Sequence, residues 1–153
     1  MQDIDAAELC RRIVAATPDA VIFADRDGIM RLWNDGAEAM FGYSAGEAIG
    51  ESLDLIIPER LQGRHWEGYH RVMETGVTKY GRELLSVPAV RKDGARLSLE
   101  FSVALLRDDA GELVGIVAVL RDITARFERD RELRQRLTAL EAQLSRTGAP
   151  AAE

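Results

Sequence analysis

The two histidines of the chain are the side chains whose type and position could support metal chemistry. His65 and His70 both lie in residues 58–75, a stretch that the sequence predicts to be one helix. A single imidazole that projects from a helix into an apolar cavity can bind a haem iron, whereas on the outer face it is an ordinary polar group. The two histidines are five residues apart and therefore lie on different faces of the helix. The direction of His65 decides whether the chain does iron chemistry.

Other metal sites and catalysis by the protein alone are not indicated. Two histidines without thiolates or well-placed carboxylates cannot form a closed structural zinc site, and the one cysteine, Cys10, allows no internal disulfide. The sequence contains no phosphate-binding loop and no Ser-His-Asp arrangement. Asp25, Asp27, Asp93 and Asp108 fall at expected turns, where acidic residues usually serve the turn itself.

The composition is that of one globular domain with terminal extensions. The chain has 153 residues, of which 46% are hydrophobic and 30% are charged. Its net charge is −6 and it has no basic block, so nucleic acid is not expected as a partner. No apolar run reaches the length of a membrane span, and the N-terminus lacks the features of a signal peptide. We therefore expect a soluble, cytoplasmic protein.

Short strands and short helices alternate in the first half of the chain. Asp27-Gly28 is a hairpin turn signal between two apolar runs, and Ser44 with Glu47 has the spacing of a capping box. Gly76 is expected to end the longest helix. The predicted elements are a helix over 3–16, strands over 20–25 and 29–33, short helices over 37–41 and 45–50, and a helix over 58–75.

Three strands are predicted in the second half, over 82–91, 95–106 and 113–121. Within 95–106, apolar and polar side chains alternate, which is the period of a sheet with one buried face. Five antiparallel strands with a helical insert on one face make an α+β domain, with a cavity between the sheet and the helices.

A charged helix is expected from residue 123 to the end of the ordered chain. Leu133, Leu137, Leu140 and Leu144 follow the 4-3-4 spacing of a coiled-coil seam, which favours a homodimer over a helix that folds back on its own sheet. The predicted organisation is an N-terminal helix over 1–16, a core over 17–122, a dimerisation helix over 123–146 and a disordered tail over 147–153.

Short motifs spread over residues 17–124 resemble the PAS sensory-domain family, in the order of that family. They are Pro18-Asp19-Ala20-Val21-Ile22, Asp25-Arg26-Asp27-Gly28, Trp33-Asn34, Phe41-Gly42-Tyr43, Ile49-Gly50, Arg91-Lys92-Asp93-Gly94 and Arg121-Asp122-Ile123-Thr124. The resemblance implies the PAS fold, a five-stranded antiparallel sheet with a ligand pocket under its helical side. PAS modules hold haem, flavin, small organic ligands or nothing, so the fold alone does not settle the function.

Flavin is the less favoured cofactor. The light-sensing PAS domains need an adduct-forming cysteine ahead of the long helix, and residues 44–60 contain none. A non-covalent flavin could stack on Trp33 or Trp66, although core packing is the more usual role of each tryptophan.

Haem b is indicated by a more specific resemblance. Residues 58–76 resemble the haem-bearing helix of the rhizobial oxygen-sensor kinases, and this resemblance places His65 as the axial iron ligand. It also places Arg71 near the haem propionates, which Lys79 could reach as well. Both cations could equally be ordinary surface charges.

The opposite side of the predicted haem pocket departs from the oxygen sensors. Leu85 stands where they carry an arginine that hydrogen-bonds the bound gas, and Phe101 and Val103 would also face the iron. An apolar wall donates no hydrogen bond, so it favours carbon monoxide or nitric oxide over stable oxygen binding. Candidate donors near this wall are Tyr80, Arg82 and Ser86.

These observations favour a haem-binding sensor of a diatomic gas or of redox state. It would act as a homodimer through its terminal helices and pass its state to a separate signalling partner, because the chain ends one helix beyond the expected core. A first alternative is a small haem enzyme, on a loose resemblance to the standalone bacterial N-nitroglycine lyases, which break a nitramine. A second alternative is a cofactor-free dimerisation or adaptor module whose pocket is filled by Trp33, Phe41 and Phe101.

Overall fold

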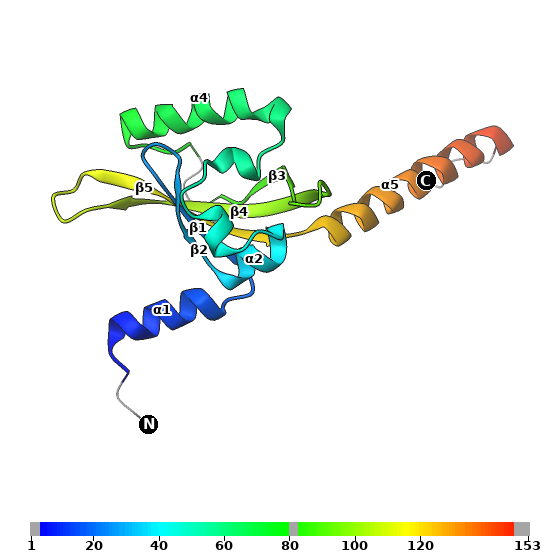
Figure 1. Ribbon diagram of the computed structural model, residues 1–153. Helices are drawn as coiled ribbons and strands as arrows, with labels where there is room; N and C mark the ends of the chain where they lie inside the picture. Colours follow the sequence, from blue (N-terminus) through cyan, green and yellow to red (C-terminus); the bar gives the residue numbers. More distant parts are fainter. Residues whose placement is uncertain (1–3, 80–82, 149–153) are drawn as a thin grey trace. The chain divides into compact units, whose positions relative to one another are not determined.

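The computed structural model of the chain describes residues 4–79 and 83–148. Residues up to Asp122 form one compact unit, and residues from Ile123 onward form a second. The first unit contains the sheet and all the elements around it, and the second consists of one long helix (Figure 1). Within the described residues, no helix is both long and apolar enough to cross a bilayer.

The sheet of the first unit has five strands, and every neighbouring pair is antiparallel. Its spatial order is β2-β1-β5-β4-β3, so the first and last strands of the sequence lie together at the centre (Figure 1). The predicted α+β fold with a five-stranded antiparallel sheet is confirmed. The strands are β1 (Ala20–Asp25), β2 (Met30–Trp33), β3 (Leu85–Val90), β4 (Arg96–Arg107) and β5 (Leu113–Asp122).

The helical insert connects β2 to β3, as the sequence predicts. Its last and longest helix, α4, is drawn along one side of the sheet (Figure 1). The short 3₁₀ turn η1, which precedes α4, is an element that the sequence analysis missed. The helices of the first unit are α1 (Ala6–Ala16), α2 (Asp35–Phe41), α3 (Ala45–Ala48), η1 (Leu53–Leu55) and α4 (Glu59–Thr75).

Local signals set most of the helix ends. The Ser44 side chain accepts from the Glu47 amide and the Glu47 side chain accepts from the Ser44 amide, so the predicted capping box of α3 is confirmed. α4 ends at Gly76, which adopts the left-handed conformation with φ of 66° and donates to the Val72 carbonyl. The strand predicted over 82–91 is shorter than expected, because β3 begins at Leu85 and residue 82 lies outside the described residues.

Two apolar clusters lie between the sheet and the helical insert. In the larger one, the rings of Trp33 and Phe41 lie 5.4 Å apart, and both side chains are buried. In the smaller one, Tyr69 and Met73 of α4 pack with Ala24 of β1 and Leu113 of β5. α4 is therefore fixed to the ends of β1 and β5 through its C-terminal half.

Asn34 is a buried polar residue that joins three elements at one end of the sheet. Its Oδ1 accepts from the Val21 amide at 2.8 Å and, as the N-cap of α2, from the Ala37 amide at 2.9 Å. Its Nδ2 donates to the backbone carbonyls of Val14 at 2.9 Å, Asp19 at 3.0 Å and Thr17 at 3.5 Å. This network ties the C-terminal end of α1 to β1 and α2.

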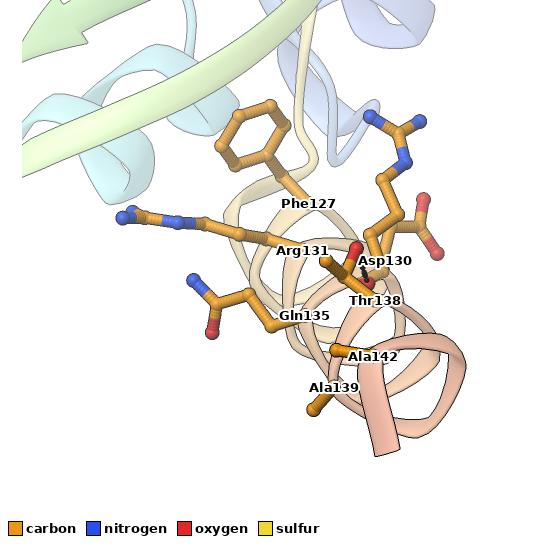
Figure 2. Close-up of a pocket in the computed structure, with 8 residues that line it drawn as sticks. Phe127, Asp130, Arg131, Gln135, Thr138, Ala139 and Ala142 are labelled. Carbon is orange, nitrogen blue, oxygen red and sulfur yellow. Dashed lines mark hydrogen bonds between the residues drawn. The ribbon is translucent and has the colours of Figure 1, made fainter. Parts of the chain in front are cut away.

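The second unit is the helix α5 (Thr124–Thr147). Its leucines at the predicted seam positions 133, 137, 140 and 144 are all more than half exposed. A shallow groove runs along a different side of α5, and Phe127, Gln135 and Ala142 are among the residues that line it (Figure 2). The coiled-coil dimer stays a prediction, and the predicted tail lies outside the described residues from residue 149 onward.

Candidate ligand site on α4

His65 is half-buried on α4, and its Nδ1 atom is shielded from solvent. This nitrogen has no hydrogen-bond partner among residues 4–79 and 83–148. Nearly all buried polar side-chain atoms in proteins are hydrogen-bonded, and those that are not are usually explained by a ligand, an ion or water. The Nδ1 atom of His65 is such an exception among the described residues, and water, an ion or a ligand would satisfy it.

The two aromatic side chains beside His65 already use their polar atoms in hydrogen bonds to other residues. The Trp66 ring meets the imidazole nearly edge-on at 5.0 Å, and the Tyr69 ring lies 5.8 Å away. The Trp66 indole donates to Asp54 Oδ1 at 2.7 Å, and the Tyr69 hydroxyl donates to the carbonyl of Asp25 at 2.5 Å. These contacts fix both rings but leave the imidazole without a hydrogen bond from either.

The electrostatic environment favours the neutral form of His65. Burial lowers the pKa of its imidazole below the ordinary value, the Asp54 carboxylate opposes this shift, and the nearby His70 adds to it. A neutral imidazole has a lone pair with which to bind a metal ion. For Tyr69, burial raises the pKa above the usual range, so its hydroxyl stays protonated and remains a donor.

Trp66 is positioned by the turn between β1 and β2. Gly28 in this turn has φ of 75°, and a Cβ atom there would lie only 2.1 Å from the Trp66 ring. The side chain of Trp66 therefore occupies space that only a glycine leaves open, and its indole nitrogen reaches Asp54 in η1 from there. The sequence identifies Asp27-Gly28 as a turn, but it carries no signal that Trp66 packs on this turn and donates to Asp54.

The predicted apolar residues come together on the face of the sheet that the core clusters cover. Leu85 of β3 lies directly opposite Phe101 of β4, and Val103 is the next residue on the same side of β4. Phe101 packs against the larger cluster. All three side chains are half-buried, and Val87, on the same side of β3, is 38% exposed. This part of the sheet is therefore apolar and incompletely covered.

Neither of the two cations that the sequence predicts to bind the haem propionates is buried. Arg71 is exposed, and its guanidinium lies 3.7 Å from the Glu67 carboxylate one turn earlier. Lys79 is exposed as well. Of the candidate donors, Ser86 lies on the opposite side of β3 from Leu85, because it pairs with Glu100 on the outer face. Ser86 is therefore not a donor on this wall, and Tyr80 and Arg82 lie outside the described residues.

Among the residues that the structure describes, no protein-only metal site competes with His65. In the described part of the chain, no three His, Cys, Asp or Glu side chains gather closely enough to hold an ion. The second histidine, His70, is exposed and stacks on the Trp66 ring at 5.9 Å with the planes 29° apart. His65 is therefore not part of a cluster of metal-ligating side chains among the described residues.

Comparisons with known proteins agree with this architecture. A family profile described as the PAS fold matches residues 14–128. The chain is 30% identical to the sensor protein FixL of Bradyrhizobium diazoefficiens over 74% of its own length, and it spans 22% of that protein. It is 28% identical to the oxygen sensor protein DosP of Escherichia coli over 80% of its own length, and it spans 15% of that protein.

A solved structure shows the same fold. The PAS domain of a protein from Colwellia psychrerythraea superposes with a TM-score of 0.69 at 22% identity, over 79% of this chain and 99% of that one. At this identity the likeness concerns the fold alone.

Proposed function

Because the chain belongs to the PAS family of sensory domains, we propose that it senses a diatomic gas or a redox state through a b-type haem held by His65. The observation that carries the proposal is the buried, unpartnered Nδ1 of a histidine whose pKa is lowered toward the neutral form. Leaving such an atom unsatisfied costs about 1–3 kcal/mol, which a bound ligand would offset.

Specific side chains would hold the haem. His65 would hold the iron, while Leu85, Phe101 and Val103 would provide an apolar wall, since all three share one half-exposed face. Arg71 and Lys79 are exposed cations that would pair with the haem propionates. Arg71 would leave the Glu67 carboxylate, which lies 3.7 Å from its guanidinium, to do so. A bound haem supplies a redox-active iron that takes small gases. The apolar wall donates no hydrogen bond, so carbon monoxide and nitric oxide are the favoured ligands.

Signalling would pass through a homodimer to a separate partner. The chain spans less than a quarter of the two sensor relatives, whose names state a sensory role. The exposed leucines of α5 at coiled-coil spacing would form the dimer seam, and the helix would carry the change of state onward.

The absorption spectrum of protein expressed with haem supplied tests the proposal. Wild-type protein should show a Soret band that is lost or shifted in His65→Ala. His70→Ala is the matched control, because His70 lies five residues further along the same helix but is exposed. It should keep the wild-type spectrum. A wild-type protein that stays colourless after reconstitution would overturn the proposal.

A cofactor-free interaction module is the second candidate, and one observation favours it. Trp33 and Phe41 are buried against each other, with Phe101 packed at the edge of their cluster. If no cofactor binds, this cluster would serve as the core of a dimerisation domain. Colourless protein that still dimerises would support this candidate.

A further inference from the structure

The N-terminal half of α4 is held more loosely than the C-terminal half. Among residues 59–68, all of which the structure describes, none is buried, whereas Tyr69 and Met73 in the second half are buried in the smaller apolar cluster. The carbonyl of Gly76, directly after the helix, accepts from the Arg107 guanidinium at 3.1 Å. Burial and this hydrogen bond fix the second half to the sheet, and the first half shares neither of them.

Two glycines weaken the first half further. Gly63 and Gly68 lie inside α4, on either side of His65 and Trp66. A Cβ atom at either position would meet no atom of the described residues within 4 Å, so packing does not require glycine there. A glycine inside a helix favours unwinding, because its backbone loses more conformational freedom on folding than that of alanine. The sequence therefore lowers the stability of the helix around the candidate site.

The indole of Trp66 connects this loosely held half to the rest of the unit. Its ring lies in the space that Gly28 leaves open in the β1–β2 turn, and its nitrogen donates to Asp54 Oδ1 at 2.7 Å. The turn and η1, which receive the ring together, are joined by a backbone hydrogen bond of their own. Gln62 also donates to the carbonyl of Ile57 at 3.2 Å, but this carbonyl lies in the segment that leads directly into α4.

We propose that residues 59–68 form a gate over the His65 site, which opens when this half of α4 unwinds and closes when the Trp66 indole returns to Gly28 and Asp54. In the closed arrangement the Nδ1 atom of His65 is shielded from solvent. Opening would free His65, because it directly precedes Trp66 in the helix. The inference rests on the proposed function for the identity of the ligand, since haem is what the gate would admit. The motion itself belongs to the haem-free protein and can be measured without haem.

Amide hydrogen exchange in the haem-free full chain, followed by NMR, tests the gate. The amides of residues 63–68 report on the first half, and those of residues 73–75 report on the second, because their helical acceptors are residues 69–71. The first set should exchange faster in the wild-type protein. Trp66→Phe lacks the indole N–H, so it should accelerate exchange of the first set about tenfold and leave the second set unchanged.

Matched variants separate the gate from a general loss of stability. Asp54→Asn keeps an oxygen acceptor and should stay near the wild-type rates, whereas Asp54→Ala should resemble Trp66→Phe. Gly63→Ala combined with Gly68→Ala should slow exchange of the first set about twentyfold, because each alanine favours the helix by about fivefold. Gly46→Ala is the control for these two, since Gly46 lies in α3, where a Cβ atom would make only an ordinary contact at 3.8 Å. It should leave the exchange of α4 unchanged.

Two exchange results would overturn the gate. Equal acceleration of both sets in Trp66→Phe would mean that the whole helix leaves the sheet. Unchanged exchange in the variant with both glycines replaced would mean that the first half does not unwind.

The rate of haem uptake, followed at the Soret band, tests what the gate admits. Uptake should be about tenfold faster in Trp66→Phe and about twentyfold slower in the variant with both glycines replaced. Unchanged uptake rates would overturn the gate as the route to His65. A wild-type protein that takes up no haem would overturn the proposed function, and the exchange rates would still decide whether the gate opens.

Discussion

The buried amide of Asn34 makes the strongest prediction about stability. In Asn34→Ala, the amides of Val21 and Ala37 lose their acceptor, and the carbonyls of Val14 and Asp19 lose their donor. Loss of the N-cap of α2 costs about 1 kcal/mol. Each further backbone group left unpaired and shielded costs about 1–3 kcal/mol, although groups near the surface recover part of this from water.

These contributions give a loss of about 3 kcal/mol for Asn34→Ala, a large share of the 5–15 kcal/mol typical of a domain. With a urea m-value of about 2 kcal/mol/M, the unfolding midpoint should fall by about 1.5 M. Urea unfolding followed by far-UV circular dichroism and tryptophan fluorescence measures the shift. Both probes should agree if the first unit unfolds in one step.

Ser44→Ala is the matched control for this prediction. Ser44 also caps a helix, but its hydrogen bonds lie in an exposed capping box. Its replacement should cost no more than about 1 kcal/mol, because water replaces the lost bond. If Asn34→Ala were no more destabilising than Ser44→Ala, the reasoning from buried hydrogen bonds would be refuted.

Three further predictions concern contacts of the first unit. Gly28→Ala should destabilise the protein by about 2 kcal/mol or more, since φ of 75° disfavours alanine and its Cβ would displace the Trp66 ring; a urea midpoint unchanged from wild type would contradict this. Tyr69→Phe should cost about 1 kcal/mol by removing the donor to the Asp25 carbonyl, again measured by urea unfolding, and a neutral result would mean that the bond contributes nothing. The hydrogen bonds from Arg121 hold the pKa of Asp19 below its ordinary value, so this pair stabilises the fold above about pH 4 and the stabilisation is lost as the pH falls through the lowered pKa. Thermal melts from pH 6 to pH 2 should therefore show a weaker acid dependence in Asp19→Asn, and parallel curves would exclude the effect.

Local signals in the sequence predicted the elements well. The Asp27-Gly28 turn, the capping box at Ser44 and the helix stop at Gly76 all lie where the sequence indicates. Each of these signals acts through the conformation of a few neighbouring residues, so it can be read without knowledge of the fold. The alternating side chains of β4 likewise identified one face of the sheet, and Leu85 and Phe101 do lie opposite each other on it.

The same local signals could not predict contacts between segments that lie far apart in the sequence. Trp66 rests in the space left by Gly28 and donates to Asp54, residues 38 and 12 positions away in the sequence. No spacing rule relates a helix to a hairpin turn, since the contact depends on how the whole insert folds back. The same limit applies to Ser86, a candidate donor by sequence distance that the strand register places on the outer face.

The contrast along one turn of α4 bears most directly on function. At positions 66 and 69 the helix places aromatic side chains whose polar atoms find partners across the chain, in η1 and at the end of β1. At position 65 it places a histidine whose buried nitrogen finds none among the described residues. The side chain of Asn34 shows that this fold can provide hydrogen-bond partners for both polar atoms of a buried side chain. A buried polar atom without a hydrogen-bond partner, next to residues whose polar atoms all have partners, is the pattern expected where a protein loses some stability in order to bind a ligand. The preference for a bound cofactor over a merely structural histidine rests on this contrast, and the spectrum of His65→Ala beside His70→Ala tests it directly.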